Sequence, residues 1–176
     1  MLNRLFQNWV YATPPIALLL LGLYPFVGSG IALPVFLALP IYMLHQYEEH
    51  DQNRFAEFLN GTMGPNAKGL SAMDIWIINV IFVWFLLLVV FYLASFSPSW
   101  GVLAAYLLAI NGFVHIVWAA VFRKYNPGLW TAIALFLPLA IWIFVTVPAS
   151  IGIHVASAVL VILLHAAIMI VARRAA

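Results

Sequence analysis

Long apolar segments, each close to the length of a membrane-spanning helix, are the feature that most limits what this chain can fold into. A helix needs about 20 apolar residues to cross the hydrocarbon core of a bilayer. Short clusters of Gly, Pro and polar residues separate six such segments. They cover residues 14–27, 31–50, 72–95, 100–122, 129–148 and 151–172. The sequence therefore predicts an all-α integral membrane bundle of six transmembrane helices.

The composition supports this prediction. Of 176 residues, 66% are hydrophobic and only 7% are charged, and the mean hydropathy is +1.10. A soluble domain usually carries about a quarter charged residues. The length suits a single domain over residues 1–176. The absence of cysteine excludes thiolate metal sites, disulfides and cysteine nucleophiles.

The first apolar segment is shorter than the others. Thr13 is a candidate N-cap with Pro14 at the first helical position. A helix that starts there has about 14 residues and spans roughly 21 Å. We expect this segment to be short or re-entrant, unless the helix extends back through Trp9 with a proline kink.

The basic residues indicate how the chain is oriented in the membrane. With six spans, every Lys and Arg falls on one side of the membrane, and the positive-inside rule makes that side cytoplasmic. Both termini are then cytoplasmic, in the inner membrane of the cell, and the net charge of +2 reports orientation rather than nucleic-acid binding. The residues are Arg4, Arg54, Lys68, Arg123, Lys124, Arg173 and Arg174.

The run His45-Gln46-Tyr47-Glu48-Glu49-His50 closes the second predicted helix and carries the densest chemistry. His45, Glu48 and Glu49 stand at i, i+3 and i+4, so they share one helical face. One imidazole and two carboxylates on one face can bind a metal or transfer protons. The alternative is a helix end that emerges among polar headgroups.

Other predicted helices place polar groups at the depth of His45. His115 lies seven residues before Phe122, and His165 lies seven residues before Ala172. Each imidazole is therefore about 10 Å inside the cytoplasmic end of its helix. Polar groups within a membrane usually face the bundle interior and mark function.

Asn79 and Asn111 enter the same leaflet, and both also fit simple hydrogen bonding between helices. His154 lies near the opposite face and fits an interhelical contact. Asp74, three residues after Ser71, fits a capping box at the start of the third helix.

Together these residues predict a metal site without sulfur. His45, Glu48, Glu49, His115 and His165 are the candidate ligands, and they suit one or two ions of iron or zinc. Glu48, Glu49, His50 and Asn111 are the candidate catalytic residues. His50 is also a candidate extra ligand, and Asn111 is expected to orient a ligand or the substrate.

Three elements in order resemble one family. His45-x-x-Glu48-Glu49, Asn111-x-x-x-His115 and the run 125–132 (YNPGLWTA) are similar to the HXXEE-domain family of small bacterial membrane proteins. The resemblance covers the chain from about His45 to His165. It implies an integral membrane protein with the His-x-x-Glu-Glu residues as the candidate active centre, and it brings no reaction with it.

A looser similarity links the chain to glutamate-type intramembrane proteases of the CAAX-processing kind. In those proteins a Glu-Glu pair is followed by Arg, and later helices supply His. Here Arg54 stands one residue further from Glu48-Glu49 than that pattern requires, and the pattern does not account for His45.

We expect a metal-dependent membrane enzyme that modifies a lipid or another hydrophobic small molecule by redox or isomerase-like chemistry. One alternative is a metal-free hydrolase with Glu48 or Glu49 as the base. A proton- or metal-coupled transporter is another, and it would need polar groups continuing to His154. The last alternative is a scaffold protein whose polar residues serve only to hold helices together. The expected partners are membrane lipids and the apolar substrate, with no nucleic acid, and a bundle of this size could pair with a second copy.

Overall fold

Helices form almost the whole of the computed structural model, which describes residues 2–27, 30–63 and 67–174. Their order and bounds are α1 Leu2–Asn8, α2 Thr13–Val27, α3 Leu33–Phe36, α4 Ala38–His50, α5 Arg54–Thr62, α6 Ala72–Trp76, α7 Trp84–Phe96, α8 Val102–Phe122, α9 Leu129–Thr131, α10 Leu137–Thr146 and α11 Ile151–Ala172. Short 3-10 turns connect several of them at Trp9–Ala12, Asp51–Asn53 and Pro98–Gly101.

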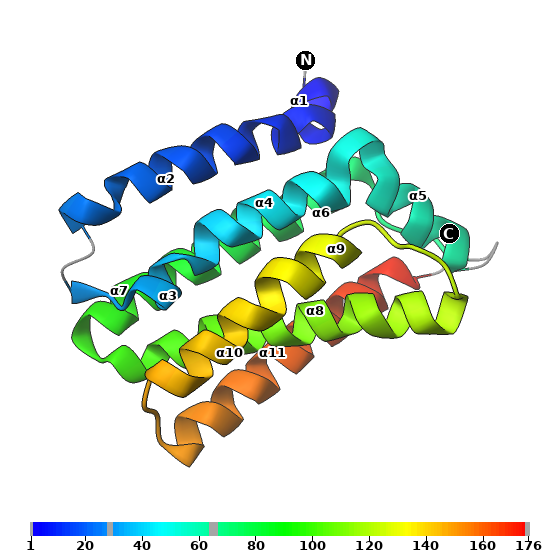
Figure 1. Cartoon of the computed structure of the whole chain (residues 1–176). Coiled ribbons are helices and arrows are strands. Elements are labelled where there is room, and N and C mark those ends of the chain that lie inside the picture. The colour runs from blue at the N-terminus through cyan, green and yellow to red at the C-terminus, as the bar shows by residue number, and fades with distance from the viewer. Residues whose placement is uncertain (1, 28–29, 64–66, 175–176) are drawn as a thin grey trace.

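Five helical stretches among the described residues are long and apolar enough to cross a membrane. They are Arg4–Phe26, Ala72–Phe96, Pro98–Phe122, Leu129–Thr146 and Ile151–Ala172. They run side by side with α4, and the start of α1, α5 and the end of α11 lie at one end of the bundle (Figure 1). The fold is therefore all-α, and its length and apolar composition indicate a membrane protein.

The first segment is longer than the sequence suggested. The 3-10 turn at Trp9–Ala12 joins α1 to α2, so the stretch Arg4–Phe26 has 23 residues. Thr13 has helical dihedral angles and its hydroxyl donates to the Val10 carbonyl at 2.7 Å, so it does not act as an N-cap. The prediction of a short or re-entrant segment that starts at Thr13 is therefore wrong for the described chain, whose helix extends back through Trp9.

The second predicted segment forms α3 and α4, which meet at a turn at Leu37. Pro34 lies in the first turn of α3. Helix α4 packs against α2 and contacts α7, α8 and the start of α9. The buried side chains of Ala38, Leu39 and Tyr42 join the main apolar core. This central position lets α4 carry its last turn into the middle of the bundle.

The region expected to be a loop between 51 and 70 contains α5. This helix buries Leu59 and lies across the end of the bundle that holds the end of α11 (Figure 1). The backbone N–H groups of Lys68 and Gly69 then donate to the carbonyls of Arg174 and Ala172 at the end of α11. The predicted breaks at Gly28-Ser29 and Gly64-Pro65 lie outside the described residues.

Two predictions about polar residues in the third helix are confirmed. Ser71 and Asp74 form the reciprocal capping box that starts α6. The Asn79 side chain accepts a hydrogen bond from Gln46 Nε2 on α4 at 3.0 Å, so it joins two helices. Asn79 lies in a π-helical stretch, Ile77–Val83, and a second π-helical stretch, Ala132–Phe136, follows α9.

Close packing of α3 against the turn before α8 predicts that Gly101 accepts no side chain. A Cβ placed on Gly101 would lie 2.5 Å from Val35 Cγ2, and Val35 is itself buried. Gly101→Ala is expected to destabilise the fold by about 1–3 kcal/mol, the usual cost of overpacking. Thermal unfolding in detergent micelles, followed by circular dichroism, measures the change.

Gly22→Ala is the matched control, because nothing lies within 4 Å of a Cβ built there. Alanine favours a helix over glycine by up to about 1 kcal/mol. An equal loss of stability in both variants would contradict the packing described at Gly101.

Candidate metal centre

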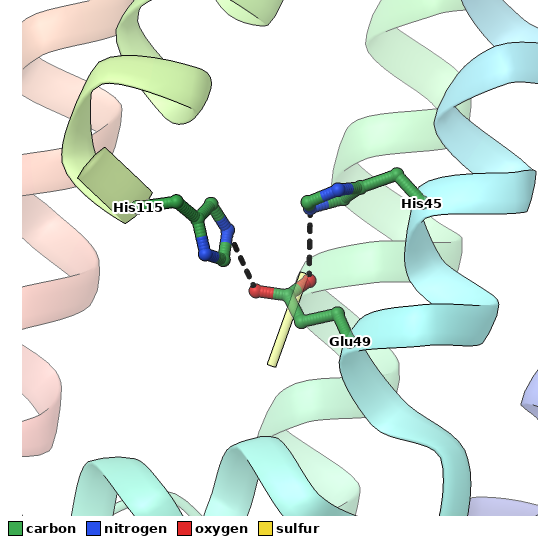
Figure 2. A group of neighbouring side chains, drawn as sticks. All are labelled: His45, Glu49 and His115. Atoms are coloured by element: carbon green, nitrogen blue, oxygen red, sulfur yellow. Dashed lines mark ion pairs between the residues drawn. The ribbon is translucent and has the colours of Figure 1, made fainter. Parts of the chain in front are cut away.

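Three side chains from two helices point toward one another inside the bundle. His45 and Glu49 lie one turn apart on α4, and His115 faces them from α8 (Figure 2). His45 Nε2 is 3.6 Å from Glu49 Oε2, and His115 Nε2 is 3.4 Å from Glu49 Oε1. One ligand atom from each residue falls within 4.8 Å of the other two. All three side chains are buried, so the group is shielded from solvent.

The far side of the His45 ring is fixed by Thr131. His45 Nδ1 lies 2.8 Å from Thr131 Oγ1, and that hydroxyl is 2.5 Å from Glu48 Oε2. The Glu48 carboxylate only accepts, so the single hydroxyl proton is directed to it, and Thr131 Oγ1 then accepts from His45. His45 therefore carries its proton on Nδ1, and the lone pair on Nε2 faces Glu49.

Asn126 fixes His115 in the same way. The Asn126 amide nitrogen donates to the His115 backbone carbonyl at 2.8 Å, so its Oδ1 accepts from His115 Nδ1 at 2.6 Å. Asn126 is buried, with 1% of its surface exposed. The lone pair on His115 Nε2 consequently also faces Glu49. Metal-binding histidines are commonly held by such a hydrogen bond from the other ring nitrogen.

The loop between α8 and α9 brings these supporting residues to the two rings. Arg123 at the end of α8 and Gly128 before α9 both have positive φ, 51° and 92°, so the chain folds back on itself. Gly128 passes directly behind the imidazoles: a Cβ there would lie 2.7 Å from Cε1 of both His45 and His115. Only glycine fits this close approach and this backbone conformation.

Glu48 holds the same loop instead of facing the imidazoles. Its carboxylate accepts from the Thr131 N–H at 2.7 Å, the Trp130 N–H at 3.2 Å and the Tyr125 hydroxyl at 2.8 Å. Burial and the Glu48 carboxylate raise the pKa of Tyr125 to about 12, so the phenol stays protonated and donates. Glu48 therefore anchors the start of α9 to α4 and lies outside the His–Glu group.

His50 contacts Glu49 from the end of α4. His50 Nε2 lies 3.0 Å from Glu49 Oε2, is buried and has no hydrogen bond of good geometry. Its ring packs between Trp9 and Phe55. His50 is thus placed beside the carboxylate, although it is not among the three residues whose ligand atoms gather together.

Asn111 and His165, the remaining candidates, lie apart from the three. The Asn111 amide donates to the Tyr42 hydroxyl at 3.1 Å, and its Oδ1 is buried without a partner. Tyr42 packs against the His45 ring, so Asn111 touches the site through one residue. His165 Nδ1 donates to the Val161 carbonyl of its own helix at 2.9 Å and is only partly buried.

The donor set fits a divalent transition metal. His45, Glu49 and His115 offer two imidazole nitrogens and one carboxylate oxygen, and the Nε2 of His45 is buried without a hydrogen-bond partner. Two His and one carboxylate bind non-haem iron(II) with open positions, and the same set occurs at catalytic zinc sites. Because Glu48 is engaged elsewhere, the geometry provides for one ion more readily than for two.

The supporting role of Asn126, Gly128 and Thr131 was missed by sequence reasoning, although all three lie in the run that carried the family resemblance. A short polar side chain after a helix predicts a cap or a turn just as well as a contact with an imidazole. Asn-Pro-Gly in 126–128 indicated the turn but not what the turn touches.

The fold and this group define a class: a helical membrane protein with two imidazoles and one carboxylate gathered in its interior. The chain belongs to the family described as a protein of unknown function with HXXEE motif, which matches residues 36–143. The match includes His45, Glu49 and His115 and ends before His165, so the resemblance extends less far than expected. No curated protein and no solved structure matches the chain.

Replacing Gly128 with alanine is expected to disrupt the group. The added methyl would overlap both imidazoles, and a non-glycine residue at this φ is itself unfavourable by about 1–2 kcal/mol. The free energy of unfolding, measured by thermal denaturation, should fall by more than this backbone cost alone. The imidazole NMR signals of His45 and His115 should also shift. Gly152→Ala is the control, since its nearest neighbour is 3.8 Å away. Unchanged imidazole signals in Gly128→Ala would contradict the geometry.

Proposed function

We propose that this protein is a metal-dependent integral membrane enzyme that modifies a lipid or another hydrophobic small molecule. His45, Glu49 and His115 hold one divalent ion, with iron ahead of zinc. The redox or isomerase-like reaction takes place near the cytoplasmic face of the inner membrane. Pairing of two copies stays a prediction.

One observation carries the proposal: two imidazole lone pairs are aimed at a single buried carboxylate. Thr131 and Asn126 accept from Nδ1 of the two rings, so each ring in its neutral form turns an Nε2 lone pair toward the carboxylate oxygens. Such an arrangement is repulsive unless a proton or a metal ion lies between the groups. The described residues give Glu49 no Lys or Arg partner within ion-pair distance. A divalent ion satisfies all three ligands at once.

The chain's own residues define how the site would work. His45, Glu49 and His115 would hold the ion, which would supply Lewis-acid or redox chemistry toward a substrate oxygen, molecular oxygen or water. Thr131 and Asn126 orient the ligand rings, while Phe136 packs on His45 with ring centroids 4.2 Å apart. His50, 3.0 Å from Glu49, is placed to accept or deliver a proton beside the carboxylate.

The membrane placement extends the proposal to six crossings. Segment 33–50 lies among the five longer spans, and counting it as a sixth puts every Lys and Arg at the end of the bundle that holds α5. That end is then cytoplasmic, with both termini inside. The His–Glu group lies close to this end, because Glu49 is the penultimate residue of α4.

A metal-free hydrolase is the second candidate, and the contact between His50 and Glu49 favours it. Glu49 would be the base, and a proton in place of the metal would join it to an imidazole.

Transport is less well supported. His154 contacts Tyr106 and Phe144, and buried apolar side chains such as Leu107, Leu108 and Ile143 occupy the helix turns between it and the site.

Elemental analysis of the purified full chain tests the proposal. We expect about one iron or zinc per chain, and roughly tenfold or greater loss of metal in Glu49→Gln and His115→Gln, which each remove a ligand. Glu48→Gln should keep the metal with about 10–100-fold lower affinity, because it loosens the residue that orients His45.

Glu57→Gln is the matched control, since Glu57 is exposed on α5 and should leave metal binding unchanged. A protein that folds and binds neither iron nor zinc after reconstitution would remove the metal-dependent proposal. If that protein still hydrolyses an amphiphilic substrate in a Glu49-dependent manner, the hydrolase is the better description.

A further inference from the structure

A groove opens at the end of the bundle that holds α5. It has a volume of about 440 Å³ and is formed by α5 and by the last turns of α8 and α11. This volume falls in the range of small-molecule binding sites. Its main lining residues are Leu59, Met63, Trp118, Phe122, Met169 and Arg173.

On α8, the groove begins about one helical turn beyond the candidate ligand His115. Trp118 is three residues after His115 on α8, and Met169 is four residues after His165 on α11. Residues at these spacings share a helical face. On α8, the wall of the groove therefore continues the helix face that carries His115, one member of the His–Glu group.

The groove is lined by apolar and aromatic side chains together with Thr62 and the cationic Arg173. Phe58 packs against Trp118 and Phe122, and the Lys124 ammonium lies 5.4 Å from the centre of the Phe58 ring. Arg173 lines the groove itself, and no carboxylate is among the described lining residues. Apolar and aromatic side chains beside a cation complement an amphiphile with a negatively charged head.

The location of the groove also fits an amphiphile with a negatively charged head. Aromatic and basic side chains concentrate where a bilayer meets water. Basic residues near the cytoplasmic surface also attract anionic lipids, each by about 1 kcal/mol. A molecule that enters from the inner leaflet would meet Arg173 with its head while its chain lies among Leu59, Trp118 and Met169.

We propose that the groove binds a single-chain anionic amphiphile of the membrane, with a long-chain fatty acid as the simplest example, and guides it to the His–Glu group. This inference rests on the proposed function, because it names the substrate class of the same site. The carboxylate pairs with Arg173, and the acyl chain fills the apolar groove.

Quenching of tryptophan fluorescence tests the proposal. The full chain, in nanodiscs of zwitterionic lipid, is titrated with a bromine-labelled long-chain fatty acid and, separately, with its uncharged methyl ester. We expect saturable quenching by the acid, and loss of most of it in Trp118→Phe, which assigns the signal to the groove. Arg173→Gln should weaken binding of the acid about fivefold, the effect of losing one partly exposed charge pair.

Arg174→Gln is the matched control, because Arg174 is also exposed, adjacent in sequence and not part of the groove. It should leave binding unchanged. Equal binding of acid and ester, or equal effects of the two arginine variants, would overturn the proposal. So would quenching that persists fully in Trp118→Phe.

Glu49→Gln separates this inference from the proposed function. Binding of the acid in Glu49→Gln should match the parent chain, since the groove does not include that carboxylate. A chain that binds metal but not the acid retains the metal centre and loses the groove inference. A chain that binds the acid but no metal supports the groove as an anionic-amphiphile site and removes the metal-dependent enzyme.

Discussion

The buried carboxylate of Glu49 is the constraint on which the rest of the site depends. An ionised carboxylate transferred out of water loses several kcal/mol of solvation, and only partners in good geometry offset that loss. In a bundle whose core is apolar, the polar groups nearest to Glu49 are imidazoles, and a cation shared with them would offset the loss. Helices α4 and α8, with the loop behind them, bring His45, His50 and His115 to one carboxylate.

The two carboxylates of the motif make different contacts. Glu49 faces the imidazoles, whereas Glu48 accepts backbone and hydroxyl hydrogen bonds at the start of α9. Because Thr131 contacts Glu48 and His45 together, the anchor of the loop is also the support of a candidate ligand. Gly128 lets the loop approach both rings, so the run 125–131 forms the back wall of the site. The family match contains these parts together, which is consistent with one structural unit.

Hydropathy predicted five of the spans, because a helix in lipid must satisfy its own backbone and present an apolar surface. The sixth predicted span, residues 31–50, is not among the described stretches that are long and apolar enough to cross. Helix α11 has the predicted bounds, Ile151–Ala172. The first helix was predicted too short, since Thr13-Pro14-Pro15 reads as a helix start, and a 3-10 turn before it is not visible in hydropathy. Helix α5 was missed, because nine residues rich in polar side chains resemble a loop.

The sequence determines how deep a residue lies in the bundle better than it determines how its helix is rotated about its axis. Counting residues from helix ends placed His45, His115 and His165 at one depth, and two of the three meet in the site. The rotation of each helix depends on its neighbours, and His165 bonds to its own backbone instead. Glu48 and Glu49 both lie near the helix face that carries His45. As consecutive residues, however, they point in directions about 100° apart around the helix axis. That difference is enough to direct Glu48 to α9 and Glu49 to α8.

The two ends of the site are unequal, and this inequality bears on function. Toward the far face, Tyr42 and Phe136 pack on His45, and buried side chains such as Ala104, Leu108 and Ala140 continue the apolar core. Toward the end that holds α5, the face of α8 that carries His115 continues into a groove that Arg173 lines. A carrier needs polar access from both sides, whereas an enzyme acting on a membrane amphiphile needs access from one. The asymmetry of this bundle is the reason that we propose catalysis ahead of transport.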